Sequence, residues 1–124
     1  PWGSEAPRCD GVRFGRGPGG GCVDASAVLA PVGTLAQDVT ATGLHDLGGN
    51  ASEWVQDQFV SPTYVDCGAC RDPIALATAG DGDDMRMFRG GNFKAPTYVA
   101  RTTTRSRWKR DAVAEGIGFR CVAR

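Results

Sequence analysis

Residues 43–54 read GLHDLGGNASEW, and the interpretation of the whole chain starts from this stretch. It places two carboxylates, Asp46 and Glu53, on either side of a Gly-Gly-Asn turn. Gly and Asn favour turns over helix interiors, and the apolar residues here do not alternate as they would in a strand. We therefore expect a rigid, buried loop with a polar anchor of its own.

Two kinds of anchor are compatible with these residues. Oxygen atoms of Asp46 and Glu53, together with backbone carbonyls between them, would suit a hard cation such as calcium, which prefers several oxygen ligands. Alternatively, Asp46 and Asn50 would accept hydrogen bonds from turn amides, and Glu53 would begin a short helix. The residues alone leave both interpretations open.

The composition is that of one small domain with many turns. The chain has 124 residues, with 18 glycines and 7 prolines, which is enough for one core and too short for two ordinary domains. Basic and acidic residues balance at 14 each, so the charge does not indicate nucleic acid as a partner. No apolar run approaches the roughly 20 residues of a membrane helix, so no membrane span is expected. The chain opens on Pro1 rather than Met, which suggests a processed product or a piece of a longer protein.

Five cysteines are many for a domain of this size in a reducing compartment. We expect disulfides Cys9–Cys22 and Cys67–Cys70, with Cys121 as a small, buried apolar residue. A zinc site is the alternative, but it would need both pairs to converge, and the spacing of the first pair is not that of a zinc knuckle. Two disulfides indicate an oxidising compartment, so an extracellular or periplasmic location is expected.

The second half of the chain contains the clearest strand patterns. Alternation of side chains predicts a mainly antiparallel sheet. The candidate strands are residues 53–59 with Trp54 inward, residues 85–89, residues 98–108 up to an internal turn, and residues 117–122 with Phe119 and Cys121 on one face. The glycines of residues 90–91 predict a bulge or sharp bend after the second of these strands.

Arginines on or beside these strands have two possible roles. The set comprises Arg89, Arg101, Arg105, Arg107 and Arg120. Bidentate contacts would allow them to line a cleft for an anionic ligand. Alternatively, each guanidinium pairs with an acid or bonds loop carbonyls, and the neutral chain, which supplies enough acids, favours this structural role. The only histidine is His45, which excludes a multi-histidine metal centre within this chain.

Several short motifs follow one another in an informative order. They are PWG at 1–3, APVG at 30–33, GLHDLGGNASEWVQD at 43–57, RGGNF at 89–93, Arg101, Arg105, and GIGFRCV at 116–122. Together they resemble the C-terminal half of the formylglycine-generating, or sulfatase-modifying factor, domain family. The resemblance implies an α+β, C-type-lectin-like fold of the sulfatase-modifying factor type, with little regular secondary structure, mainly antiparallel strands and long loops. Residues 1–124 would then be a single domain whose N-terminal half is missing, removed or on another chain.

The resemblance also implies a ligand set for the cation. In the family enzymes a turn of this kind binds calcium through two side chains and two carbonyls. These correspond to the side chains of Asp46 and Glu53 and the carbonyls of Gly49 and Ala51. A second family calcium site lies between PWG and APVG, where this chain has a glycine-rich loop with two cysteines, so its ligands cannot be placed.

The segment after RGGNF departs from the enzymes. Formylglycine-generating enzymes carry two redox-active cysteines between this motif and the following arginines, bind copper there and activate oxygen. Here residues 93–101 read FKAPTYVAR, with no cysteine and a shorter spacing. Because thiolates are the ligands that soft Cu(I) selects, neither copper binding nor formylglycine generation is expected.

The leading functional interpretation is a non-catalytic, calcium-stabilised, lectin-like module that binds a protein, peptide or glycan, although a fold does not fix a function by itself. Its expected ligand surface consists of Asn92, Lys94, Tyr98, Arg105 and Trp108. One alternative is a divergent oxidoreductase of the same family, whose catalytic groups lie on a missing segment or on a partner chain that completes the domain. Another is a purely structural subunit stiffened by disulfides.

Overall fold

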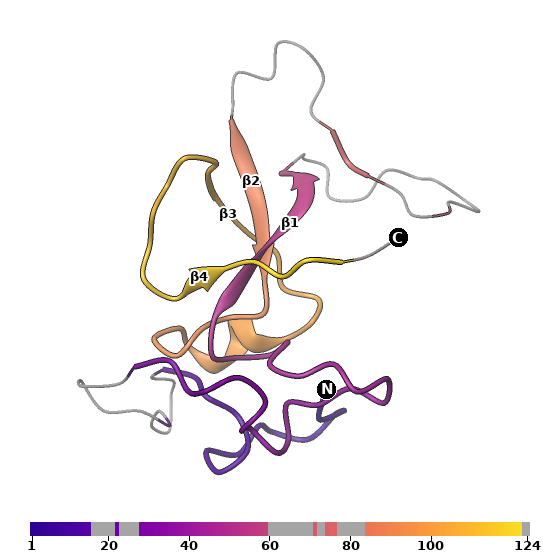
Figure 1. Cartoon of the computed structure of the whole chain (residues 1–124), viewed down its shortest axis with the longest axis vertical. Helices are drawn as coiled ribbons and strands as arrows, with labels where there is room; N and C mark the ends of the chain where they lie inside the picture. The colour runs from indigo at the N-terminus through magenta and orange to yellow at the C-terminus, as the bar shows by residue number, and fades with distance from the viewer. Residues whose placement is uncertain (16–21, 23–27, 60–70, 72–73, 77–83, 123–124) are drawn as a thin grey trace.

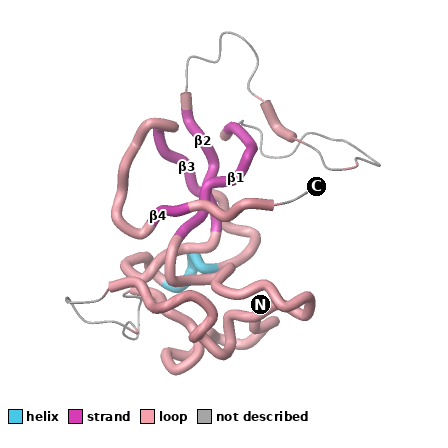
Figure 2. Tube along the Cα trace, viewed as in Figure 1, coloured by secondary structure: helices cyan, strands magenta, loops and turns pink. Residues whose placement is uncertain are grey.

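The computed structural model shows a chain of short strands and long ordered loops (Figure 1). It describes residues 1–15, 22, 28–59, 71, 74–76 and 84–122. In these residues the regular structure amounts to β1 (Ser52–Gln58), β2 (Met85–Arg89), the 3-10 turn η1 (Thr97–Ala100), β3 (Ser106–Lys109) and β4 (Ile117–Gly118) (Figure 2). No helix in this part of the chain is long and apolar enough to cross a bilayer.

The strands form one curled, mixed sheet in the order β3-β2-β1-β4. β2 pairs antiparallel with both β1 and β3, whereas β4 runs parallel to β1. Trp54 of β1 lies opposite Phe88 of β2, and their rings meet edge to face with centroids 5.6 Å apart. The predicted fold class, strands and loops with little regular structure and mainly antiparallel pairing, is therefore confirmed.

The apolar core is small and lies between the sheet and the loops. Among the described residues, the buried apolar side chains are Val12, Phe14, Met87, Phe93 and Ala100. The first two come from the N-terminal loop, Met87 from β2 and the others from the segment that follows β2. The N-terminal loop, residues 28–51 and η1 accordingly gather at one end of the sheet (Figure 1).

Residues 43–54 form the buried loop that the sequence predicts, and Asn50 is its main connection to the rest of the chain. The Asn50 side chain accepts a hydrogen bond from Ala30 N (2.8 Å) and donates one to Ala30 O (3.1 Å). Its backbone N donates to Arg13 O (2.8 Å), and its carbonyl accepts from Phe93 N (2.9 Å). One residue thus joins three segments that are distant in the sequence. Asn50 has a left-handed backbone conformation, with φ 62°, which Asn tolerates better than most residues.

The predicted strand over residues 98–108 is wrong in its first half. Thr97–Ala100 is a 3-10 turn, and only Ser106–Lys109 joins the sheet. The reason is a set of polar contacts that holds the segment compact. Arg89 Nη1 donates to Thr102 O (2.7 Å), and Thr104 Oγ1 donates to Tyr98 O (2.9 Å). Local alternation reveals neither the contact from β2 nor the side-chain bond within the segment.

Three smaller expectations also change. β4 contains only Ile117 and Gly118, and Phe119 after it is 76% exposed. Cys121 is a free thiol and is exposed rather than buried, because β4 ends at Gly118 and Cys121 lies beyond the sheet. Glu53 lies within β1 rather than at the start of a helix, and Trp54 is half-buried.

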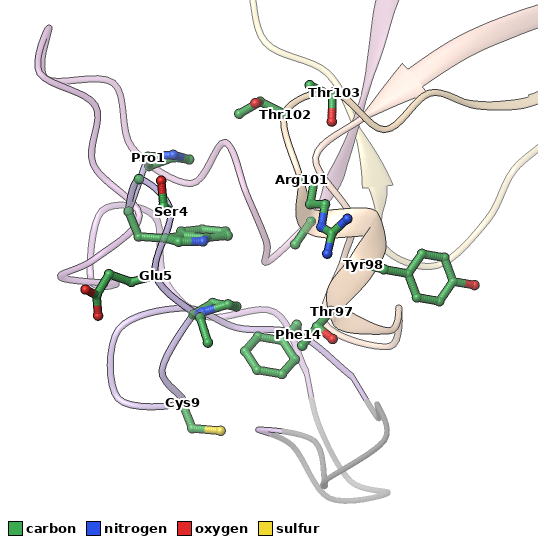
Figure 3. Close-up of a pocket in the computed structure, with 15 residues that line it drawn as sticks. Pro1, Ser4, Glu5, Cys9, Phe14, Thr97, Tyr98, Arg101, Thr102 and Thr103 are labelled. Atoms are coloured by element: carbon green, nitrogen blue, oxygen red, sulfur yellow. The ribbon is translucent and has the colours of Figure 1, made fainter.

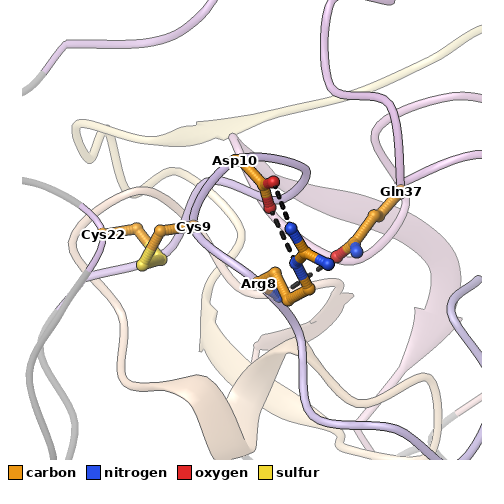
Figure 4. Close-up of a disulfide and its surroundings, with 5 residues drawn as sticks. All are labelled: Arg8, Cys9, Asp10, Cys22 and Gln37. Atoms are coloured by element: carbon orange, nitrogen blue, oxygen red, sulfur yellow. Dashed lines mark hydrogen bonds and ion pairs between the residues drawn. A yellow bond between two sulfur atoms is a disulfide. The ribbon is translucent and has the colours of Figure 1, made fainter.

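The Cys9–Cys22 disulfide is confirmed, with the two Cα atoms 4.7 Å apart (Figure 4). Beside it, Arg8 N donates to Gln37 Oε1 (3.1 Å), and the Arg8 guanidinium pairs with Asp10. These contacts attach the N-terminal loop to the segment that leads into residues 43–54. The expected Cys67–Cys70 pair lies outside the described residues.

Substitution of Asn50 should measure how much this residue stabilises the fold. Asn50→Ala removes two part-buried hydrogen bonds and leaves alanine, which tolerates positive φ less well than Asn, in the left-handed conformation. We therefore expect a loss of about 3 kcal/mol in the free energy of unfolding. Asn50→Gly removes the same bonds but relieves the backbone, so its loss should be smaller by about 1 kcal/mol. Urea denaturation of both variants tests this. Equal stability of the Ala variant and the wild type would show that Asn50 is not the connection we describe.

Candidate functional site

Behind the central loop lies a completely buried carboxylate, Asp38. Both of its oxygens are 2.9 Å from Gly48 N, and its backbone carbonyl accepts from Asp46 N (2.8 Å). Burial raises the pKa of the Asp38 carboxyl above its usual value, the hydrogen bond from Gly48 opposes this, and the nearby Asp46 charge adds to it. The buried Asp38 side chain therefore holds the Gly-Gly turn through the hydrogen bond from Gly48. Burial of its charged carboxylate is energetically unfavourable.

Of the predicted calcium ligands, Asp46 has a geometry that fits a cation. It is buried at positive φ (58°), and Oδ2 accepts a hydrogen bond from Gly33 N (2.8 Å). Oδ1 is buried and has no hydrogen-bond partner in the described part of the chain. A buried carboxylate oxygen without a donor is unfavourable, so it leaves a coordination position that a cation would satisfy.

Glu53, the second predicted side-chain ligand, is already paired. Arg120 forms a bidentate ion pair with Glu53, in which Nε donates to Oε2 (2.6 Å) and Nη2 donates to Oε1 (2.5 Å). The same Nη2 donates to the carbonyls of His45 (3.0 Å) and Asp46 (3.4 Å), and the Glu53 bond raises the pKa of Arg120. Arg120 thus pairs with an acid and bonds loop carbonyls, which is the structural role expected for it, and a cation at this loop would share Glu53 with a guanidinium.

The described residues contain no group of three or more His, Cys, Asp and Glu side chains arranged to hold a metal. The calcium set includes only two such side chains, so the carbonyls of Gly49 and Ala51 would have to supply its remaining protein ligands. The alternative interpretation of the loop, in which Asp46 and Asn50 accept hydrogen bonds from turn amides, is partly confirmed. Asp46 and Asn50 do bond backbone amides, but those amides belong to residues 30–33 instead of to their own turn.

The five residues of the expected ligand surface are spread over several elements. Lys94 N donates to Asn92 Oδ1 (2.9 Å), and the Lys94 ammonium pairs with Glu115. Arg105 lies under the sheet edge, with Nε 2.8 Å from Met87 Sδ. Tyr98 on η1 is 60% exposed and Trp108 on β3 is 48% exposed. The structure brings the first two together and places the other three elsewhere.

A cleft of about 850 Å³ lies between the N-terminal segment and η1 with the residues after it (Figure 3). Its volume is that of a small-ligand site. The lining residues include aromatic rings, hydroxyl groups and one guanidinium: Trp2, Ser4, Cys9, Phe14, Thr97, Arg101, Thr102 and Thr103. Tyr98 also lines it, but its ring points away from the N-terminal segment (Figure 3). Sequence reasoning singled out Arg101 and the unusual segment 93–101 but did not connect them with residues 1–7.

The two walls of the cleft pack against glycines of two segments, the N-terminal wall against Gly48 of the central loop and the η1 wall against Gly91 after β2. Trp2 packs so closely on Gly48 that a Cβ there would lie 2.3 Å from Trp2 Cη2. On the other side, Gly91 at φ 69° approaches Ala100, where a Cβ would lie 3.0 Å from the Ala100 nitrogen. Gly15 N donates to Ala95 O (2.7 Å) and links the two walls behind the cleft. Glycines therefore allow the close approaches on which the cleft depends.

The fold and the buried turn define a class, the sulfatase-modifying factor type of domain. Residues 14–124 match the model of the "Sulfatase-modifying factor enzyme 1-like domain", and the chain belongs to this family. It is 36% identical over 99 residues to "Formylglycine-generating enzyme" of Mycobacterium tuberculosis (strain ATCC 25618 / H37Rv), a match covering 76% of this chain and 32% of that protein.

A solved structure has the same fold. "Structure of PvdO from Pseudomonas aeruginosa" superposes with a TM-score of 0.63 at 21% identity, over 94% of this chain and 40% of that one. The chain therefore spans about a third of the curated relative and two fifths of the solved one. The family and the fold are established by these likenesses.

The raised pKa of Asp38 has a consequence for stability. Because the folded state binds this proton more tightly than the unfolded state, stability relative to Asp38→Asn should fall as pH rises from 3.8, the usual carboxyl value, through the raised folded pKa. Asp10 is the control, since its hydrogen bond to Arg8 lowers its pKa and should give an opposite, weaker trend in Asp10→Asn. Urea denaturation at a series of pH values measures both. A relative stability that rises with pH at Asp38 contradicts the assignment.

Proposed function

We propose that this chain is a non-catalytic binding module of the formylglycine-generating enzyme family, with its ligand in the cleft beside η1. The observation that supports this is the position of residues 97–101. They form one wall of the cleft, and they belong to the segment in which the family resemblance places the redox cysteines. Here the segment supplies a threonine, a tyrosine and an arginine. The cysteine that does line the cleft, Cys9, is held in the disulfide with Cys22.

The cleft chemistry suits recognition of a protein, peptide or glycan. Trp2 and Phe14 offer aromatic surface, and hydroxyl groups of Ser4, Thr102 and Thr103 offer hydrogen bonds. Aromatic surface with a few placed polar groups is the usual composition of a binding pocket. Thiolates for copper are missing from the wall, so copper is not part of this proposal.

The proposal predicts that the chain does not oxidise cysteine. Incubation with copper, oxygen and a cysteine-containing peptide should yield no aldehyde in a hydrazide-capture assay read by mass spectrometry, while a formylglycine-generating enzyme run in parallel should yield it. Aldehyde formed by this chain alone would refute the proposal. Aldehyde formed only after a companion chain is added would favour the alternative function described next.

The alternative is a divergent oxidoreductase whose catalytic groups lie outside these residues. It is favoured by the coverage of the relatives, because 60–70% of their length has no counterpart in this chain. A companion chain or additional segment with clustered histidines would then complete the domain. The disulfide between Cys9 and Cys22 supports an extracellular or periplasmic location under either function.

We further propose that calcium stabilises the central loop. Asp46 Oδ1 fits this role because it is buried and lacks a donor, and the carbonyls of Gly49 and Ala51 with Glu53 would complete the protein ligands. When bound, the ion would neutralise Asp46 and fix a turn whose backbone includes positive φ at Asp46 and Asn50. The role is structural, since this loop contributes only Gly48, through its contact with Trp2, to the walls of the cleft.

Calcium should therefore raise the thermal stability of the wild type. At about a hundredfold excess over its dissociation constant the gain is about 2.7 kcal/mol, read as an increase of Tm against an EDTA-treated sample. Asp46→Asn should abolish most of the increase, and magnesium, which prefers a stricter octahedral geometry, should reproduce little of it. Asp10→Asn is the matched control, because Asp10 is an exposed carboxylate that pairs with Arg8 and is not among the expected calcium ligands. If Tm is the same with calcium and with EDTA, calcium does not stabilise the protein and this proposal is wrong.

A further inference from the structure

Arg101 differs from the other arginines whose contacts are described. Arg8 pairs with Asp10, Arg110 with Asp84 and Arg120 with Glu53, and Arg89 bonds loop carbonyls. The Arg101 guanidinium has no hydrogen bond or ion pair within the described residues, and its side chain is exposed. It lines the cleft on the η1 side, opposite the N-terminal segment (Figure 3).

We propose that Arg101 is the anchor for a carboxylate group on the ligand of this cleft; the inference rests on the binding function proposed above and names the chemistry of its ligand. A guanidinium presents parallel N–H groups that match the two oxygens of a carboxylate, and such two-pronged, charge-assisted bonds are stronger and more directional than neutral ones. An unpaired guanidinium in a hollow is therefore a receptor for a planar oxyanion.

The backbone that carries Arg101 is fixed before any ligand arrives. Thr104 N donates to Arg101 O (3.0 Å), and Thr104 Oγ1 donates to Tyr98 O (2.9 Å). Arg89 Nη1 adds a bond to Thr102 O (2.7 Å), and the preceding Ala100 is buried. Binding would then have to order only the Arg101 side chain, which keeps the entropic cost low.

The charges around the cleft leave Arg101 available. Among the described residues that line the cleft, Glu5 is the one acidic residue, and its carboxylate points outward from the N-terminal segment, away from Arg101 (Figure 3). Ser4 and Thr102 add hydroxyl groups to the lining of the cleft, and Trp2 adds an aromatic ring. The group that fits is a carboxylate beside a compact apolar or ring-shaped body, supplied either by an acidic amino-acid side chain or by a sugar acid.

The experiment is an NMR titration that follows the Trp2 indole and Arg101 Nε–H signals. The probes are a blocked tripeptide with a central glutamate, its glutamine counterpart, methyl glucuronide and methyl glucoside. We expect at least one of the two acids to bind the wild type, and its affinity to fall by about tenfold or more in Arg101→Gln. Arg101→Lys should show an intermediate loss, because lysine keeps the positive charge but lacks the planar guanidinium that bonds both carboxylate oxygens. Arg110→Gln, an exposed arginine outside the cleft, should bind like the wild type.

Binding of either acid that depends on Arg101 supports the anchor and identifies which source supplies the carboxylate. Equal binding of an acid and its neutral counterpart, or an unchanged affinity in Arg101→Gln, overturns the anchor but leaves the cleft as a binding site. Absence of any shift at Trp2 and Arg101 with all four probes overturns the anchor and counts against the cleft function as well. Arg101→Gln should keep the wild-type dispersion elsewhere in the spectrum, because the side chain is exposed.

Discussion

The structure depends on the hydrogen bonds that Asn50 makes from a left-handed backbone. Its side chain matches both polar groups of Ala30, its N–H reaches Arg13 and its carbonyl receives Phe93. In the described residues the strands are few and the apolar core is small, so polar contacts between distant loops take a larger share of the stabilisation. Because buried polar groups are costly when unpaired, such a network specifies one arrangement of the loops.

The cleft follows from that network. Gly48 and Gly49 lie next to Asn50, and their missing side chains admit Trp2 on one side and the backbone of Arg13 on the other. The first wall of the cleft is thus set by the same turn that could hold calcium. The second wall is set by Arg89, whose contacts with Thr102 and Thr104 bend the chain after η1. One wall of the cleft and the polar network around Asn50 therefore depend on neighbouring residues of one loop.

The arginines show where sequence reasoning succeeds and where it stops. Pairing with acids and loop carbonyls was favoured for the group, and Arg120 and Arg89 fulfil it. Sequence could not separate Arg101 from them, because strand-like alternation describes its surroundings equally well. The 3-10 turn at Thr97–Ala100, and the bond from Arg89 to Thr102 O after it, instead place Arg101 in the lining of the cleft. The residues of the expected ligand surface likewise lie on several elements, because side-chain alternation did not reveal the 3-10 turn within residues 98–108.

The sequence by itself determined the family, the buried turn at residues 43–54, the strands at residues 85–89 and near residue 53, and the Cys9–Cys22 bridge, since these rest on local motifs, turn chemistry and side-chain alternation. Tertiary structure alone decided that Arg120 holds Glu53, that Cys121 is exposed, and that the N-terminal segment and η1 enclose a cleft. Each of these joins residues far apart in the chain, and no local pattern encodes which distant partner a side chain will meet.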